Sequence, residues 1–484
     1  MISDLINKIK NIPLSLKASI AYSVCSILQN CIGLITVPLF TRMLSTEQYG
    51  QQTIYSSWSS LISIFITLNL AYGSFSTAMM KFEGKRDSYI SAIQGICVML
   101  SLLFLGFYFL FQSFFDTLFE LPSYLIVLMV FQILSQTSIQ LWSGKKRFEF
   151  KYKSVVWVSL TMSILSPVCA YLFVRTATEK GYALIMGNIV VSLIFGVCIF
   201  VLNQIRGKKL LDLEYWKFVL RFNIPLMMYY ISQMIFNQSD RIMISHMVGI
   251  GSAAKYGVAY NLAMIMNFVL VSINGAYVPW FYGKIKENKS EENQKVSVMI
   301  ALLLACVILF VIWYSPELIT IMAGAQYAEA IYVVAPVAMS LLLLFYVQLF
   351  INVEFYYEEN VLLVWASIGS AIVNVVLNYI FIPVFGFVAA GYTTLFSYII
   401  FVICNYYAMK HILKERNLID NMYDYKSLMI LFLVFVLMSF LGVTLYETLI
   451  CRLCITVIVV VIMYCNRRKF IDIMKQINGK EVVV

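Results

Sequence analysis

Fourteen apolar runs, each close to the length of a helix that crosses a bilayer, take up most of the 484-residue sequence. A transmembrane helix needs about 20 predominantly apolar residues. The chain is 61% apolar and 12% charged, whereas soluble domains are about a quarter charged. The sequence therefore predicts an all-α polytopic membrane protein with 14 transmembrane helices. The runs are 18–40, 52–73, 90–111, 122–142, 155–174, 182–202, 223–247, 256–280, 296–314, 331–352, 361–383, 387–408, 428–446 and 450–465.

The two ends of the series need separate comment. The first run has no signal-peptide cleavage pattern and leads directly into further runs, so we expect it to be a retained helix. The last run is short and contains Arg452, whose side chain we expect to reach the membrane interface.

Neither a metal site nor a catalytic site is predicted. The ten cysteines lie in or at the ends of apolar runs, and Cys451 and Cys454 form one CxxC pair that we interpret as small apolar helix residues. The two histidines, His246 and His411, have no evident chemical partner in the sequence. No ATP-binding motif is present, and the outward loops are too short for a folded catalytic domain. These features favour a transporter over an enzyme.

Basic residues predict the orientation of the chain. With the N-terminus in the cytoplasm, most of the 35 lysines and arginines fall in inward-facing segments, as the positive-inside rule requires. An even number of spans then places both termini in the cytoplasm. The net charge of +10 follows from this orientation and from attraction to anionic membrane lipids, and it predicts no nucleic-acid partner. One inward turn, 354–359, is acidic and lacks a basic residue, so its carboxylates are candidates for another role.

The two halves of the chain show a weak internal repeat. A shift of 207 residues aligns 22–50 with 229–257, and STEQYG then meets SAAKYG. Because the shift contains six runs, the copies have the same orientation and form a parallel repeat. We therefore expect two six-helix lobes, residues 1–210 and 211–415, followed by two further helices and a cytoplasmic tail in 416–484.

The first run of each predicted lobe carries a polar stripe at helical spacing. In run 18–40 this stripe comprises Ser19, Tyr22, Ser26, Gln29, Asn30 and Gly33, and in run 223–247 it comprises Tyr230, Gln233, Asn237, Asp240 and Arg241. The repeat superposes Asn30 on Asn237. These stripes are expected either to line a shared polar cavity or to join neighbouring helices through interhelical hydrogen bonds.

Charges within the runs are the strongest functional candidates. A charge at the bilayer centre costs about 2.5–3.5 kcal/mol on insertion scales, so Asp240 and Arg241 have either a functional or gating role or a structural ion pair.

Two further arginines lie where apolar runs meet the interface. Arg42 follows Pro38, and Arg221 precedes Pro225. Each arginine is expected either to meet an anionic head group or to anchor the chain at the interface.

Several stretches resemble one family. They are PLFTRMLSTEQYG at 38–50, WKFVLRFNIPLM at 216–227, NQSDR at 237–241, KYGVAY at 255–260 and NVVLNYIFIPVFGFVAAGYTT at 374–394. In these stretches the sequence resembles Wzx-type polysaccharide, or O-antigen, flippases of the multidrug/oligosaccharidyl-lipid/polysaccharide (MOP) exporter superfamily.

The resemblance implies a MATE-like, two-lobed bundle in the inner membrane that works by alternating access and needs no cofactor. The implied substrate is an undecaprenyl-diphosphate-linked oligosaccharide, translocated for O-antigen or capsule assembly. The implied partners are membrane lipids, a polysaccharide polymerase and a chain-length regulator. The residues that match these roles are Arg42, Arg221 and Arg241 for the diphosphate, Asn30, Tyr230, Gln233 and Asn237 for the sugars, and Asp240, Pro38 and Pro225 for coupling or bending.

Two other functions remain open. A multidrug or metabolite exporter of the same fold would be driven by Na⁺ or H⁺, and either ion is also open as the coupling ion of a flippase. A membrane enzyme of glycan assembly is disfavoured by the short outward loops.

Overall fold

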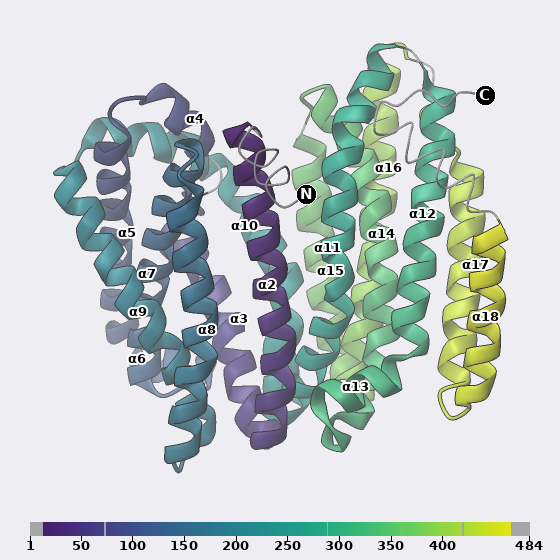
Figure 1. Ribbon diagram of the computed structural model, residues 1–484, viewed down its shortest axis with the longest axis horizontal. Helices are drawn as coiled ribbons and strands as arrows, with labels where there is room; N and C mark the ends of the chain where they lie inside the picture. Colours follow the sequence, from purple (N-terminus) through teal and green to yellow (C-terminus); the bar gives the residue numbers. More distant parts are fainter. Residues whose placement is uncertain (1–12, 72–73, 288, 360, 419–420, 466–484) are drawn as a thin grey trace, which may run out of the picture. The chain divides into compact units, whose positions relative to one another are not determined.

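The computed structural model describes residues 13–71, 74–287, 289–359, 361–418 and 421–465, and these residues form helices joined by short turns (Figure 1). The chain divides into two compact units, Met1–Ile242 and Met243–Val484. We describe each unit by itself.

The N-terminal unit contains eight helices within the described ranges and most of a ninth. They are α2 (Leu14–Met43), α3 (Thr46–Thr67), α4 (Phe75–Lys81), α5 (Arg86–Leu110), α6 (Gln112–Phe119), α7 (Ser123–Phe148), α8 (Tyr152–Thr176), α9 (Lys180–Gly207) and α10 (Leu213–Met247), which crosses the division between the units.

The C-terminal unit continues the pattern of long helices joined by short elements. Its helices are α11 (Ile250–Lys286), α12 (Ser290–Trp313), α13 (Ser315–Ala323), the 3₁₀ turn η1 (Ala325–Ala330), α14 (Ile331–Tyr356), α15 (Val361–Phe385), α16 (Val388–Glu415), α17 (Tyr425–Thr444) and α18 (Leu449–Cys465).

Each of the fourteen apolar runs overlaps its own long helix in the described part of the chain. The run 52–73 continues beyond Thr67, where α3 ends, and its residues 72–73 lie outside the described ranges. Eleven helices there are long and apolar enough to cross a membrane. The other three long helices are α3 and α10, which carry more polar residues, and α18, which has 17 residues. The prediction of an all-α polytopic membrane protein is therefore confirmed with eleven candidate spans.

Small residues allow close packing in the N-terminal unit. A Cβ atom on Gly187 of α9 would lie 2.4 Å from Cα of Ala170 on α8, and one on Gly196 would lie 2.2 Å from Cβ of Ser135 on α7. Small residues commonly let membrane helices approach in this way, because lipid supplies no hydrophobic drive for their association. Helix α9 is thus held against both α7 and α8.

The first half of α10 packs on this unit. Tyr215 and Val219 belong to the same apolar cluster as residues of α4 and α5. The Trp216 indole donates a hydrogen bond to the carbonyl of Ala92, 2.8 Å away, and the Asn223 amide oxygen accepts one from the backbone N–H of Ser74 at 3.1 Å. The division between the units accordingly falls inside α10, after Ile242, whereas the expected lobe boundary at 210 precedes this helix. That lobe boundary stays a prediction.

The basic connections of the N-terminal unit meet at one end. Lys145, at the end of α7, pairs with Asp87 at the start of α5, and with Glu149 at 3.4 Å. The Ser88 hydroxyl donates to the carbonyl of Gly207, the last residue of α9, at 3.1 Å. Loops predicted to share one side of the membrane therefore share one end of this unit.

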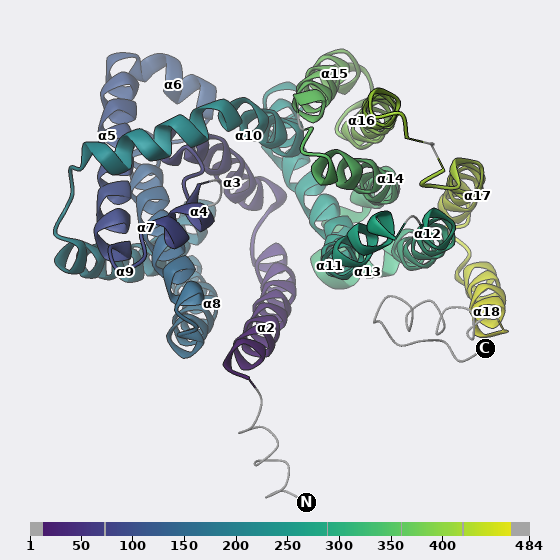
Figure 2. The ribbon, with the colours of Figure 1, turned by 90° about the horizontal axis from the view of Figure 1, so that it is seen from above.

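Helix α14 forms the centre of the C-terminal unit, where α11, α12, α16 and α17 contact it (Figure 2). Most of its residues are buried. At the edge of the unit, a Cβ atom on Gly442 of α17 would lie 2.0 Å from Cδ1 of Trp313 on α12. Only glycine at this position lets α17 approach the indole so closely.

Arg452 is buried within the protein, whereas the sequence led us to expect a side chain that extends to the membrane interface. Its side chain is 2% exposed. The guanidinium donates to both carboxylate oxygens of Glu317, at 2.7 and 2.8 Å, and to the backbone carbonyls of Trp313 and Tyr446. Burial beside a carboxylate and two carbonyls satisfies the guanidinium inside the protein and ties α18 to α12 and α13.

Candidate functional site

A polar pocket of about 340 Å³ lies inside the N-terminal unit, between α2, α3, α8 and α9. Three of these four helices are candidate membrane spans. Polar groups at membrane depth are costly, and they commonly mark substrate pathways. The polar residues that line the pocket are Gln29, Thr36, Tyr49, Gln52, Ser163, Ser166 and Asn188.

The pocket is built by hydrogen bonds between helices. The Gln29 amide donates to the Ser163 hydroxyl at 3.0 Å, which joins α2 to α8. The Ser166 hydroxyl donates to the Asn188 amide oxygen at 2.8 Å, which joins α8 to α9. These bonds fix the positions of amide and hydroxyl groups around the cavity.

Gln52 on α3 presents an open acceptor to this pocket. Its amide nitrogen donates to the Ser56 hydroxyl at 2.9 Å. Its oxygen Oε1 is buried and accepts no hydrogen bond from the described residues. A buried acceptor without a donor is costly, so a ligand hydroxyl that donates to this oxygen would be favourably bound.

The second half of α10 brings a cation close to the pocket. Arg241 is 8% exposed and its neighbour Asp240 is 1% exposed. The Arg241 guanidinium donates to the Gln238 amide oxygen at 2.8 Å. It also lies close enough to Tyr49, which lines the pocket, for its charge to act on the phenol. The fold therefore places the buried positive charge of Arg241 near the amides and hydroxyls that line the pocket.

Two other residues predicted on α10 have neighbours within the N-terminal unit. The Asn237 amide donates to the backbone carbonyl of Gln233 at 2.6 Å, within the same helix. The Tyr230 hydroxyl lies close to the side chain of Asn69.

The remaining predicted site residues lie apart from the pocket lining. Arg42 and Arg221 are exposed at the end of α2 and in the first half of α10. Pro38 and Pro225 lie inside these two helices, where proline disrupts the helical hydrogen-bond ladder. Asn30 is half-buried, and its neighbour Gln29, from the same predicted stripe, lines the pocket. The roles assigned to all these residues stay predictions.

Sequence reasoning missed Gln52, Ser163, Ser166 and Asn188 as site residues. Ser163, Ser166 and Asn188 are polar positions inside the fifth and sixth apolar runs, so a search for isolated polar residues in every run would have found them. The predicted polar stripes belong to the first run of each lobe, which contains none of these residues.

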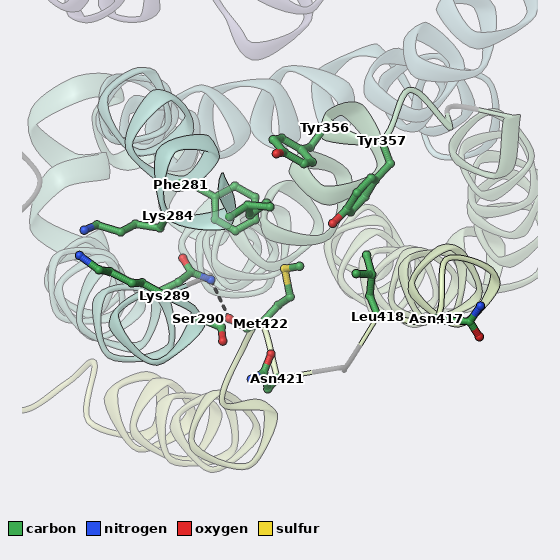
Figure 3. Close-up of a pocket in the computed structure, with 12 residues that line it drawn as sticks. Phe281, Lys284, Lys289, Ser290, Tyr356, Tyr357, Asn417, Leu418, Asn421 and Met422 are labelled. Atoms are coloured by element: carbon green, nitrogen blue, oxygen red, sulfur yellow. Dashed lines mark hydrogen bonds between the residues drawn. The ribbon is translucent and has the colours of Figure 1, made fainter. Parts of the chain in front are cut away.

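A second pocket, of about 560 Å³, lies at one end of the C-terminal unit (Figure 3). Tyr356 and Tyr357, from the end of α14, face it from one side, and Lys284 and Lys289 lie on another. The Lys284 ammonium pairs with Glu287 at 3.1 Å and with Glu292 at 2.9 Å. Because acidic neighbours balance these lysines, the pocket is polar without being strongly basic.

Hydrogen bonds join α12 to residues 421–422 beside this second pocket. The Asn293 amide donates to the backbone carbonyl of Met422, and the Gln294 amide donates to that of Asn421, both at 2.6 Å. The hydrogen bond from Lys284 lowers the pKa of Glu287 below its usual range. A search of the described ranges finds no cluster of histidine, cysteine and carboxylate residues that would hold a metal ion.

Known proteins resemble this chain in sequence and in fold. "Lsg locus putative protein 1" of Haemophilus influenzae is 23% identical over 370 residues, which cover 74% of this chain and 89% of that protein. An inward-facing multidrug resistance MATE family transporter of the MOP superfamily has a TM-score of 0.62 at 15% identity, covering 82% of this chain and 98% of that one. The lipid II flippase MurJ, in an inward closed conformation, has a TM-score of 0.62 at 14% identity, covering 90% and 100%.

These similarities confirm the expected MATE-like fold, which this chain shares with that MATE family transporter and with MurJ. Residues 15–283, more than half of the chain, match the family described as "Polysaccharide biosynthesis protein". The chain therefore belongs to the polysaccharide biosynthesis protein family.

Proposed function

We propose that this protein is a flippase for undecaprenyl-diphosphate-linked oligosaccharide repeat units, which it moves from the cytoplasmic to the outer leaflet of the inner membrane. The transported units would serve the assembly of a surface polysaccharide, O-antigen or capsule. The observation that carries the proposal is the polar pocket between α2, α3, α8 and α9, with the buried cation of Arg241 beside it. Membership of the polysaccharide biosynthesis family and the fold shared with a lipid II flippase support it.

The chemistry of the pocket suits a sugar carrier. A charged diphosphate with several sugars cannot cross about 30 Å of hydrocarbon unaided, because unpartnered polar groups there cost several kcal/mol each. Amides such as Gln29 and Asn188 offer donors and acceptors to sugar hydroxyls, and the ring of Tyr49 offers an apolar face. A guanidinium such as that of Arg241 binds phosphate oxygens through paired, charge-assisted hydrogen bonds.

The transport cycle follows from the predicted roles. Fourteen spans, in two six-helix lobes and a C-terminal pair, would alternate between inward-open and outward-open states with both termini in the cytoplasm. Arg221 and Arg241 would capture the diphosphate, with Tyr230, Gln233, Asn237 and Asn30 contacting the sugars. Bending at Pro38 and Pro225, gated by Asp240, would then release the head group near Arg42. A polysaccharide polymerase and a chain-length regulator would receive the product.

Deletion with complementation tests the proposal. A strain without this chain should lack the surface glycan and accumulate lipid-linked repeat units in the inner leaflet, and the wild-type chain should restore export. Arg241→Ala should fail to restore export although the protein reaches the membrane at the normal level. Arg175→Ala, which removes an exposed arginine at the end of α8, is the matched control and should restore it. Normal surface glycan in the deletion strain would refute the proposed function.

The second candidate function is an ion-driven drug or metabolite exporter, which the equal TM-score with a MATE transporter favours. In that case the deletion strain would keep its surface glycan and become more sensitive to toxic compounds. The same strains thus separate the two functions.

A further inference from the structure

A carboxyl group is buried without a partner near the end of α14. Glu354 is 0% exposed, and neither of its carboxylate oxygens has a hydrogen-bond partner in the described part of the chain. Its sequence neighbours in the acidic turn behave differently, because Glu358 and Glu359 are exposed and Glu359 pairs with Arg416 at 3.3 Å. Only Glu354 of this acidic group is held inside the protein.

The packing of α14 on α16 shows what lies opposite Glu354. Three contacts set the register of these two helices. In each contact, the residue on α16 follows its partner on α14 by nearly the same number of sequence positions. A Cβ on Gly391 would lie 2.9 Å from Pro336, the Phe350 and Tyr406 rings are 5.7 Å apart, and Arg416 donates to the Tyr357 carbonyl at 3.1 Å. This register places Glu354 opposite the part of α16 around Met409, one turn beyond Asn405.

Asn405 supplies an open acceptor in the same region. It is 0% exposed, and its amide nitrogen donates to the Phe401 carbonyl at 2.7 Å. Its oxygen Oδ1 is buried and unpaired within the described residues. A protonated carboxyl group has an O–H donor and an ionised one has none, so protonated Glu354 can donate to an acceptor in this region and ionised Glu354 cannot.

Within the described ranges, Glu354 forms no ion pair that would neutralise it when it is ionised. The charged groups at this end of the packed helices have other partners or are exposed. Lys284 on α11 pairs with Glu287 and Glu292, Lys410 on α16 lies over the rings of Tyr406 and Tyr425, and His411 pairs with Glu415. The exposed charged residues are Lys286, Glu291, Lys295, Lys414 and Lys426. The nearby phenols are also engaged, since Tyr277 donates to Asn293 and Tyr423 donates to the Leu349 carbonyl. A buried carboxylate without a cation is costly, so the neutral form is favoured.

A pocket lies at the end of the helix that carries this group. The 560 Å³ pocket of Figure 3 is lined by Tyr356 and Tyr357, which follow Glu354 at the end of the same helix. A small separation of this end of α14 from α16 would expose the carboxyl group to the pocket.

We propose that Glu354 is a proton-binding site of the C-terminal unit. Its carboxyl group carries a proton while α14 is packed on α16. It releases that proton to water in the adjoining pocket when this end of the unit opens, and it must regain one before the helices close. In the transport cycle this step would couple proton movement to opening, a role that rests on the proposed flippase function.

Infrared spectroscopy of the full-length protein in lipid vesicles tests the site independently of transport. At neutral pH the wild type should show the C=O stretch of a buried carboxylic acid, and this band should vanish in alkaline buffer. Glu354→Gln should remove the band, whereas Glu358→Gln, an exposed neighbour, should leave it unchanged. Glu354→Asp retains an acid if the glutamine variant folds poorly. A neutral-pH spectrum that is identical in wild type and Glu354→Gln would overturn the proposal.

Flipping in the same vesicles tests the coupling. An imposed pH gradient should change the wild-type rate several-fold, and the Glu354→Gln rate should not respond to the gradient. A gradient response that survives in Glu354→Gln, or one that follows Na⁺ instead, would overturn the assignment to this residue. If the wild-type protein shows the infrared band but flips no substrate, the flippase function is refuted and the proton-binding site remains supported.

Discussion

Replacing Arg452 by methionine should destabilise the C-terminal unit by removing the contact that holds α18. The guanidinium is 2% exposed, whereas the Glu317 side chain is 37% exposed. Methionine keeps much of the side-chain volume and removes every donor. The change leaves the carboxylate of Glu317 and the carbonyls of Trp313 and Tyr446 without this partner.

The magnitude follows from the asymmetry in exposure. Removing one member of a buried ion pair costs about 3–5 kcal/mol, because the other charge is left uncompensated. Here water can reach the carboxylate of Glu317, so the loss lies at the low end, about 3 kcal/mol. A domain of roughly 150–250 residues loses about 2–4 °C in Tm per kcal/mol, so we expect a fall of about 6–12 °C.

Thermal unfolding of the purified protein at several pH values measures this effect. The hydrogen bond from Arg452 holds the pKa of Glu317 below its usual range. The stabilisation is therefore fully present above the pKa of an unfolded glutamate and is lost as the pH falls through the lower, folded value. The difference in Tm between wild type and Arg452→Met should be largest at neutral pH and should shrink in acid.

A matched control and a double variant make the test decisive. Arg416→Met removes an exposed arginine that pairs with Glu359, and it should cost at most about 1 kcal/mol. Adding Glu317→Gln to Arg452→Met should cost little more than Arg452→Met alone, because the pair is already broken. A change in Tm below about 2 °C at neutral pH for Arg452→Met would refute the reasoning.

Two further predictions concern the N-terminal unit. Gly187→Ala should destabilise it by about 1–3 kcal/mol in denaturation experiments, because the new Cβ would meet the backbone of Ala170. The control Gly106→Ala, which has open space around it, should not destabilise the unit. Equal losses of stability in the two variants would contradict this explanation. Burial raises the pKa of Glu149, but the hydrogen bond from Lys151 and nearby lysine charges outweigh burial and hold that pKa below its usual range. Glu149→Gln should therefore lower stability at neutral pH and have little effect below the folded pKa, and a loss that persists unchanged in acid would be inconsistent with the ion pair.

The sequence by itself determined the class of the protein and the positions of its long helices. Every apolar run overlaps a helix in the described residues, because a span must satisfy its backbone hydrogen bonds internally and a helix does so whatever its neighbours are. Loops predicted to share one side of the membrane meet at one end of each unit, as Lys145 with Asp87 and Arg416 with Tyr357 show. Stretches such as 38–50 and 216–227 also indicated the family that residues 15–283 match.

Only the tertiary structure decided which polar groups meet. Gln29 bonds with Ser163, Arg241 lies by Tyr49, and Arg452 binds Glu317, each across more than a hundred residues of sequence. A run that is apolar on all sides does not reveal which face turns to lipid and which to protein. The sequence therefore does not identify which residues its few polar side chains contact. For the same reason Arg452 was expected at an interface, and the burial of Glu354 was not foreseen. These properties depend on neighbouring helices, which the periodicity of a single helix does not specify.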